Sequence, residues 1–193
     1  MKHGRCGRLS IPRTAESDVT STKPQSDFPD LIKLPACTVR DVAHGVGLFA
    51  TRDIAEASTI LAVEGRLQPY PTRYSIQIDA ALHVDADASL PDSEMRLRHP
   101  WRFLNHCCEP NARIEGRLLR AIRAIALGEE ITFDYTTTEA DMSTPFQCLC
   151  GSARCIGHVR GFNHLPEDAR RARMDRLAPH LRARVAARAD GAA

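Results

Sequence analysis

Short stretches in which apolar and polar residues alternate, separated by turn-forming residues, dominate the middle of the chain. Such alternation is typical of β-strands, because successive side chains of a strand face opposite sides of a sheet. We predict strands at Cys37–Asp41, Gly47–Arg52, Thr59–Val63, Tyr74–Ile78, Leu82–Val84, Ala112–Glu115, Arg117–Ile122 and Glu130–Tyr135. Their shortness and spacing predict a mainly β fold of small sheets with little helix.

Two stretches favour helix instead. The first is Ser89–Leu104, although Pro91 and Pro100 limit its length, because proline lacks the backbone N–H that a helix interior needs. The second begins at Pro166, which two acidic residues follow, an arrangement that favours a helix N-terminus. A partial apolar stripe continues it at Ala169, Ala172, Leu177, Leu181 and Val185. Pro179 is predicted to kink or split this helix.

The composition is that of one globular domain with tails. The chain has 193 residues, of which 43% are hydrophobic and 26% charged, as in ordinary soluble domains. Residues 1–30 are rich in Ser, Thr, Pro and charge, so we predict a disordered leader there and a folded part that starts near Leu31. The net charge of +2 is too small to indicate nucleic-acid binding. No stretch resembles a signal-peptide core or could span a membrane, which predicts a soluble protein in a reducing location.

The cysteines carry the strongest chemical signal. Seven cysteines, an odd number without a secretory signal, favour metal ligation or free thiols over a disulfide framework. Cys148, Cys150 and Cys155 form a CxCx4C pattern. Thiolates at this spacing can occupy three corners of a tetrahedral zinc site, and the fourth ligand must come from elsewhere. The pair Cys107–Cys108, earlier in the chain, can supply it, so the metal would join two distant segments.

These cysteines allow two other interpretations. They could be thiols that bind no metal, or they could belong to a small zinc module that binds nucleic acid, although such modules usually have a second CxxC pair, which is absent here. The Arg-rich segment after Leu165 also contains Glu167, Asp168 and Asp175 and has no aromatic platform. We therefore interpret it as a solvated helical face and expect no direct nucleic-acid binding.

Four further strings are ambiguous when each is taken alone. Asn105-His106 before a proline-containing turn can simply satisfy backbone groups. The glycines around Val46 can form an ordinary turn. Tyr74 and Tyr135, on predicted strands, can be packing aromatics.

Taken together, these strings resemble the SET-domain protein lysine methyltransferases that carry a cysteine-bearing post-SET tail. The strings are HGVGLFATRDI from His44, YSIQID from Tyr74, RFLNHCCEPN from Arg102, GEEITFDY from Gly128 and CLCGSARC from Cys148. The resemblance implies a SET-domain fold, with β-clip-like small sheets and a knot-like C-terminal arrangement. It divides the chain into a SET domain at 31–140, a zinc-binding post-SET segment at 141–164 and a C-terminal helical tail at 165–193.

The same resemblance implies two cofactors, S-adenosylmethionine and zinc, and assigns residues to each. Tyr135 matches the active-site tyrosine that orients the target amine and the methyl group. Phe133 matches the position of the family's Phe/Tyr switch, and Phe there resembles enzymes that add more than one methyl. The residues implied for S-adenosylmethionine are Gly45, Val46, Gly47, Leu48, Tyr74, Arg102, Asn105 and His106. Those implied for zinc are Cys108, Cys148, Cys150 and Cys155, with Cys107 where the family usually has Ser.

The chain departs from the family pattern at two places. Val63 stands where a tyrosine of the lysine channel is common, and His99-Pro100-Trp101 replaces the usual Gly-Asn before the RFxNH motif. Val63 is the best support for the alternative of a SET-like binding module without catalysis.

The expected partner is a protein segment that contains lysine, from a histone or another basic protein, with no membrane involved. The expected location is the cytoplasm if the source is bacterial, with the nucleus or export as an effector as alternatives. The sequence leaves the target lysine and the oligomeric state open.

Overall fold

The computed structural model describes residues 35–42 and 45–190, with side chains described as far as residue 187. The predicted leader at 1–30, the predicted start of the folded part near Leu31, and His44 of the glycine string lie outside these residues. Within the described part the molecule is mainly β, as predicted, with several small sheets and few helices.

The central sheet brings together segments that are far apart in the sequence. Its order is β1-β2-β10-β7, with bounds Cys37–Val42, Gly45–Ala50, Glu130–Phe133 and Asn105–His106. β2 pairs with β1 and β10 in antiparallel fashion, whereas β7 lies parallel to β10, with Thr132 opposite Asn105 and Phe133 opposite His106. This parallel pair places the RFLNH and GEEITF strings side by side. The knot-like threading stays a prediction.

Three smaller sheets surround the central one. The order of the first is β3-β9-β8, with bounds Thr59–Ala62, Leu118–Ala121 and Ala112–Glu115. The order of the second is β4-β6-β5, with bounds Arg66–Gln68, Leu82–Asp85 and Ile76–Asp79. The last is a short hairpin of β11, Phe146–Gln147, and β12, His158–Val159. All pairings within these sheets are antiparallel.

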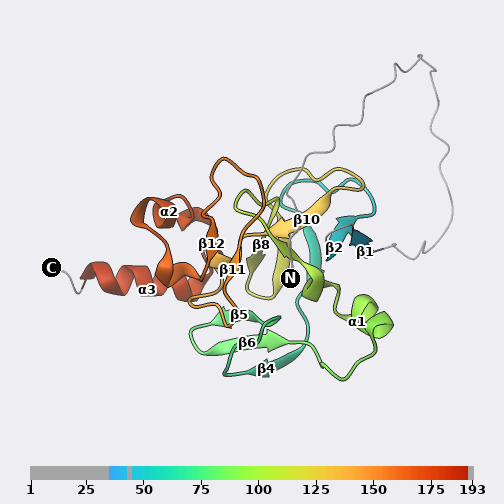
Figure 1. The fold of residues 1–193 in the computed structure, drawn as a ribbon, viewed down its shortest axis with the longest axis horizontal. Coiled ribbons are helices and arrows are strands. Elements are labelled where there is room, and N and C mark those ends of the chain that lie inside the picture. Colours follow the sequence, from blue (N-terminus) through green and yellow to red (C-terminus); the bar gives the residue numbers. More distant parts are fainter. Residues whose placement is uncertain (1–34, 43–44, 191–193) are drawn as a thin grey trace, which may run out of the picture.

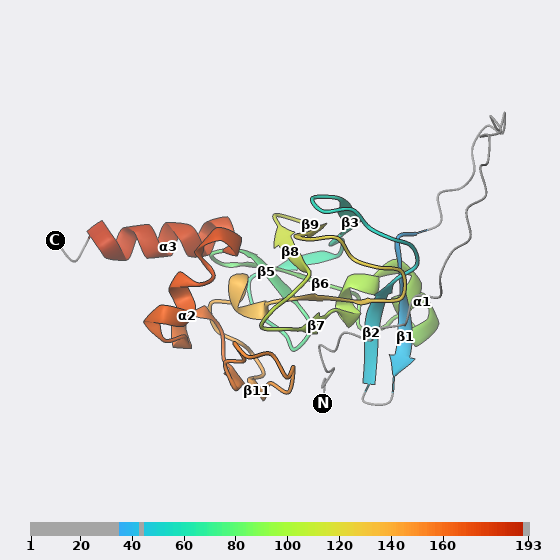
Figure 2. The ribbon, with the colours of Figure 1, turned by 90° about the horizontal axis from the view of Figure 1, so that it is seen from above.

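The described helices are short and lie at the two ends of the molecule. They are α1 at Asp92–Arg98, α2 at Glu167–Arg171 and α3 at Pro179–Asp190. Figures 1 and 2 both place α2 and α3 at one end and α1, beside β1 and β2, at the other. No described helix combines the length and the apolar character needed to cross a membrane.

The largest apolar core lies between the three larger sheets. Leu48 and Ile131 come from the central sheet, Leu119 and Val84 from the other two, and Val63 follows β3; all five are completely buried. Burying such a side chain contributes roughly 1.5–3 kcal/mol. Because each of the three larger sheets supplies part of this core, these sheets are held in one arrangement although each has only short strands.

Each of the two predicted helical regions is divided into shorter helices. Ser89–Leu104 forms only α1 and a 3-10 turn at Pro100–Phe103, since Pro100 cannot continue the helix. The C-terminal region splits into α2, a 3-10 turn at Met174–Arg176 and α3, and Pro179 begins the last helix. Proline at a first helical turn loses no hydrogen bond, which is why splitting there costs little.

The strand predictions missed some elements and misplaced the ends of several others. β2 is Gly45–Ala50 rather than Gly47–Arg52, and β5 begins at Ile76, so the prediction that Tyr74 lies on a strand was wrong. β4, β7, β11 and β12 were not predicted, because strands of two or three residues carry too few side chains to show alternation. The predicted strand Glu130–Tyr135 ends at Phe133, and Tyr135 begins a 3-10 turn over Tyr135–Thr137. Asp134 accepts a hydrogen bond from the backbone N of Thr136 and so ends the strand there.

Candidate functional site

The segment that leads into β7 is anchored by a buried tryptophan. Trp101 is 1% exposed and its indole N–H donates to the carbonyl of Glu64 at 2.9 Å. The ring of His99 lies 3.0 Å from the same carbonyl. The 3-10 turn at Pro100–Phe103 is therefore fixed against the strand region that precedes β4, and it positions Arg102 and Leu104. The departure His99-Pro100-Trp101 thus has a structural role of its own.

Asn105 joins β7 to the first residues of β2. The sequence predicted a glycine turn around Val46, but Gly45–Gly47 are strand residues that pair with β1. Its Nδ2 donates to the carbonyl of Val46 at 3.0 Å and to Glu130 Oε1 at 2.7 Å. A Cβ added at Gly47 would lie 2.6 Å from Glu130 Oε1 and 3.2 Å from Asn105 Nδ2, so a side chain there would displace the ends of both side chains. Asn105 Oδ1 is buried and has no hydrogen-bond partner among the described residues. One hydrogen-bond acceptor next to the start of β2 is thus available.

His106 connects the tyrosine to the cysteines. Its Nδ1 accepts the backbone N–H of Tyr135 at 3.2 Å, so the ring proton is assigned to Nε2, which lies 3.2 Å from Cys108 Sγ. The ring also packs edge-on against Tyr135 and Phe146, at centroid distances of 5.3 and 5.8 Å. One buried ring therefore holds both the tyrosine backbone and the first cysteine in place.

Tyr135 is fixed through its hydroxyl. The hydroxyl donates to the carbonyl of Leu104 at 2.5 Å, and the ring lies 4.8 Å from that of Phe133. Burial, together with the negative charges of Glu130 and Glu139, raises the pKa of Tyr135 above its usual value. The hydroxyl consequently stays protonated at neutral pH and acts by position and hydrogen bonding rather than as a base.

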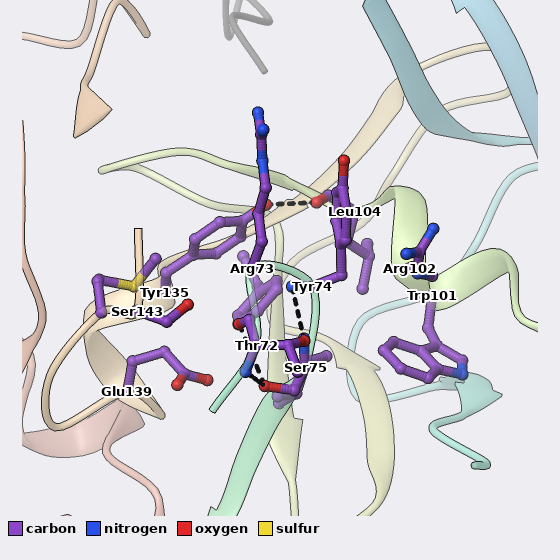
Figure 3. Close-up of a pocket in the computed structure, with 13 residues that line it drawn as sticks. Thr72, Arg73, Tyr74, Ser75, Trp101, Arg102, Leu104, Tyr135, Glu139 and Ser143 are labelled. Carbon is purple, nitrogen blue, oxygen red and sulfur yellow. Dashed lines mark hydrogen bonds between the residues drawn. The ribbon is translucent and has the colours of Figure 1, made fainter. Parts of the chain in front are cut away.

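A narrow pocket opens at the tyrosine. Its free volume is about 30 Å³, room for roughly two water molecules. Tyr74, Arg102, Phe133 and Tyr135 line it together with Glu139. Figure 3 shows Tyr135 and Glu139 on one side of this space and the turn at Thr72–Ser75 facing them. The guanidinium of Arg102 lies 4.0 Å from the centre of the Tyr74 ring. No sequence pattern marks Glu139; the only clue is its place four residues after Tyr135.

The predicted site residues thus form two neighbouring groups. Tyr74 and Arg102 line the pocket with Phe133 and Tyr135. Val46, Gly47, Asn105 and His106 lie along the contact between β2, β7 and β10. Gly45, at the start of β2, adopts a φ of +137°, which favours glycine. Leu48 differs from the rest, because its side chain is completely buried in the apolar core.

The predicted metal ligands come together in space. The sulfur atoms of Cys108, Cys148, Cys150 and Cys155 all lie within 4.8 Å of one another, and those of Cys108 and Cys148 are 3.9 Å apart. Four thiolates about 2.3 Å from a zinc ion at tetrahedral angles would be about 3.8 Å apart. The cluster therefore fits a tetrahedral ion that prefers sulfur. Cys107, the other candidate, points its sulfur to the carbonyl of Glu109 instead, at 3.2 Å.

Two hydrogen bonds fix the loop that carries three of these cysteines. The backbone N of Cys148 donates to the carbonyl of Gly157 at 2.6 Å, and Ser152 Oγ donates to Glu109 Oε2 at 2.7 Å. Gly157 has a φ of +72°, a left-handed conformation that glycine adopts without strain. The hydrogen bond from Ser152 to Glu109 thus joins the hairpin loop to the β7–β8 connection, beside the four clustered sulfurs.

Comparison with known proteins gives one family and a set of partial relatives. Residues 45–136 match the family model described as SET domain. The histone-lysine N-methyltransferase trithorax of Drosophila melanogaster is 36% identical over 138 residues, which cover 60% of this chain and 3% of that protein. The H3 lysine-4 specific histone-lysine N-methyltransferase of Kluyveromyces lactis is 29% identical over 192 residues, covering 81% of this chain and 18% of that protein. The chain spans only a small part of the length of either relative.

A solved structure shows a weaker similarity. The methyltransferase domain of the human histone-lysine N-methyltransferase SETMAR has 18% sequence identity and a TM-score of 0.47, over 63% of this chain and 56% of that one.

Proposed function

The chain contains a SET domain, and from that premise we propose that it transfers methyl groups from S-adenosylmethionine to lysine side chains of a protein substrate. The observation that carries the proposal is the position of Tyr135, whose hydroxyl is fixed by the Leu104 carbonyl at one wall of a narrow pocket. Such a hydroxyl can orient an amine without removing its proton.

The residues implied for the cofactor fit it in one testable respect. S-adenosylmethionine has an ammonium group that needs acceptors, and Asn105 Oδ1 is a buried acceptor that no described residue satisfies. Gly45–Gly47, the first three residues of β2, lie beside it, and the two glycines leave the backbone open to close approach. We assign Asn105, His106, Gly45–Gly47, Tyr74 and Arg102 to the cofactor. When bound, S-adenosylmethionine supplies a methyl group on a sulfonium, which an amine can attack directly.

The chemical demand on the protein is alignment and a neutral lysine. A free lysine with a pKa of about 10.4 is almost wholly protonated at neutral pH, and removing the proton costs roughly 4–5 kcal/mol. Burial in a narrow pocket lowers that cost by disfavouring the charged amine. Holding the amine in line with the methyl group contributes several kcal/mol more. Tyr135 and Phe133 are the residues we assign to this alignment.

The identity of residue 133 bears on how many methyl groups are added. Phe133 is 3% exposed and its ring lies 4.8 Å from that of Tyr135. A phenylalanine there has no hydroxyl to hold a water or crowd a substituted amine. We therefore infer that the pocket accepts a lysine that already carries a methyl group.

We assign the four clustered cysteines to zinc, whose role is structural. The ion would join the β7–β8 connection to the β11–β12 hairpin, and Phe146 of that hairpin packs on Tyr135 at a centroid distance of 5.9 Å. Bound zinc would thus support one side of the tyrosine through Phe146.

A histone or another basic protein is the substrate class we favour, because the relatives named above are histone-lysine methyltransferases. Val63, which stands where a channel tyrosine is common, is completely buried in the apolar core. It does not line the pocket, so this departure leaves the pocket walls to other residues, among them Met142 and Ser143.

The test is transfer of labelled methyl groups from S-adenosylmethionine into purified core histones and cell-extract proteins. We expect label in lysine with the wild type and at least a 100-fold lower rate with Tyr135→Phe, because the variant keeps the ring and loses only the hydroxyl that contacts Leu104. Tyr70→Phe is the matched control, since Tyr70 is 56% exposed and lies outside the pocket lining. Cofactor binding without any label in protein would instead favour a SET-like binding module.

A further inference from the structure

Glu139 is a buried carboxyl group without a role in the reaction proposed above. It is 6% exposed and lines the pocket that contains Tyr135. Of the 13 described residues that line this pocket, Glu139 is the only acidic one. Figure 3 shows its carboxylate turned inward, toward the space between Tyr135 and the turn at Thr72–Ser75.

The carboxylate is held by one of its oxygens. Oε1 accepts the backbone N–H of Gln77 at 2.7 Å and lies 3.4 Å from the hydroxyl of Thr138. Gln77 also accepts the backbone N–H of Ala140 through its own side chain, at 2.9 Å. Among the described residues none donates a hydrogen bond to Oε2. The orientation is therefore fixed while one oxygen can still bind a ligand.

The other charged side chains around the pocket are positive, so this carboxylate affects whether an ammonium group can enter. Arg73 and Arg102 also line the pocket, and an incoming lysine would bring another positive charge. Without a carboxylate, like charges would oppose entry of the ammonium. A fixed negative group in this pocket both attracts an ammonium and can take its proton. Burial raises the pKa of Glu139 to about 7, which suits a group that must gain and lose a proton near neutral pH.

We propose that Glu139 binds the ammonium group of the target lysine in this pocket and accepts its proton before methyl transfer. The inference rests on the proposed function. An N–H bond of the ammonium breaks, an O–H bond forms on the Glu139 carboxylate, and the electron pair stays on the lysine nitrogen. That pair then forms the new N–C bond while the S–C bond breaks and its electrons go to sulfur. The proton on Glu139 leaves to water after the methylated lysine departs.

The first experiment needs no knowledge of the protein substrate. S-adenosylhomocysteine and sinefungin are both analogues of S-adenosylmethionine, and sinefungin carries an amine, protonated near neutral pH, where the methyl group would be. Calorimetry at pH 8 would compare the two ligands on the wild type, on Glu139→Gln and on Asp141→Asn. Glu139→Gln keeps an oxygen for the Gln77 N–H, so the local fold is retained. Asp141→Asn removes a charge two residues away, from an exposed side chain outside the pocket lining.

The preference is the Kd for S-adenosylhomocysteine divided by the Kd for sinefungin. We expect this ratio to fall at least 10-fold in Glu139→Gln and to stay at the wild-type value in Asp141→Asn. An unchanged preference in Glu139→Gln would overturn the role of Glu139 and leave the proposed function standing. If the wild type binds neither ligand, the proposed function itself is wrong and this inference falls with it.

A second measurement separates proton acceptance from simple attraction. In the methyl-transfer assay at pH 8 and saturating histone, a lost general base lowers kcat by about 100-fold or more. A kcat that stays at the wild-type value in Glu139→Gln, with only KM raised, would refute proton acceptance.

Discussion

A buried carboxyl group such as Glu139 costs stability, and the cost depends on pH. Its pKa is about 7 in the folded protein against an ordinary value of 4.5. Between these values the folded state holds a proton that the unfolded chain releases, so the stability attributable to this group falls as pH rises from about 4.5 to about 7. Each tenfold change in proton affinity corresponds to about 1.4 kcal/mol, so the full cost above pH 7 is about 3 kcal/mol.

Glu139→Gln should therefore make the protein more stable at pH 8, by up to about 3 kcal/mol, and change it little at pH 4.5. Denaturant unfolding at both pH values measures this directly. Asp141→Asn, which alters an exposed group, should show no such pH-dependent gain. Equal stability of Glu139→Gln and the wild type at pH 8 would mean that the carboxylate is well solvated in the folded protein.

At the scale of elements, the cysteine cluster bears on the position of the β11–β12 hairpin. The hairpin has only two residues in each strand, too few to be stable alone. It carries Phe146, which packs on His106 and Tyr135. A metal ion bound to the four clustered sulfurs would fix the position of the hairpin, and with it the packing around the tyrosine.

Cys148→Ser should lower the zinc content per chain and reduce methyl transfer at least 10-fold while the larger sheets stay folded. Elemental analysis gives the metal content, and hydrogen exchange should show lost protection over residues 146–159 but not over β2 and β10. Cys37→Ala is the control, because Cys37 is a buried thiol outside the cluster. Full activity in a zinc-free Cys148→Ser protein would show that catalysis does not depend on the metal.

At the scale of the whole molecule, the C-terminal region contacts the segment that carries Tyr135. Arg173, between α2 and α3, forms an ion pair with Asp134 at 2.7 Å, and their side chains are 5% and 0% exposed. His180 lies 2.8 Å from the carbonyl of Thr138, and the backbone N of Ala178 donates to Thr137 at 2.8 Å. The segment Asp134–Thr138, which contains Tyr135, is thus held from outside the matched family region.

Arg173→Met should destabilise the protein by about 3–5 kcal/mol, because it leaves the Asp134 carboxylate buried without its partner. Adding Asp134→Asn should recover part of that loss, since the uncompensated charge is removed. Thermal or denaturant unfolding of the single and double variants gives both values. Arg171→Met is the control: its ion pair with Glu167 is 73% and 80% exposed, and such pairs contribute at most about 1 kcal/mol. If Arg173→Met lowered the free energy of unfolding by no more than about 1 kcal/mol, the Asp134 carboxylate would have to be solvated in the folded protein.

The sequence by itself determined the mainly β class, the family resemblance and the cysteine set, because these depend on local alternation and on short strings of fixed spacing. Only the tertiary structure decided that Cys108 rather than Cys107 joins the cluster, since neighbouring residues on one chain point in different directions. The ends of strands were also settled in three dimensions, as at Tyr135, where the Asp134 side chain starts a turn. Glu139 and Arg173 carry no sequence signal at all. Their significance comes from burial and from partners 62 and 39 positions away, and the physical reason is that desolvation depends on the folded surroundings of a charge.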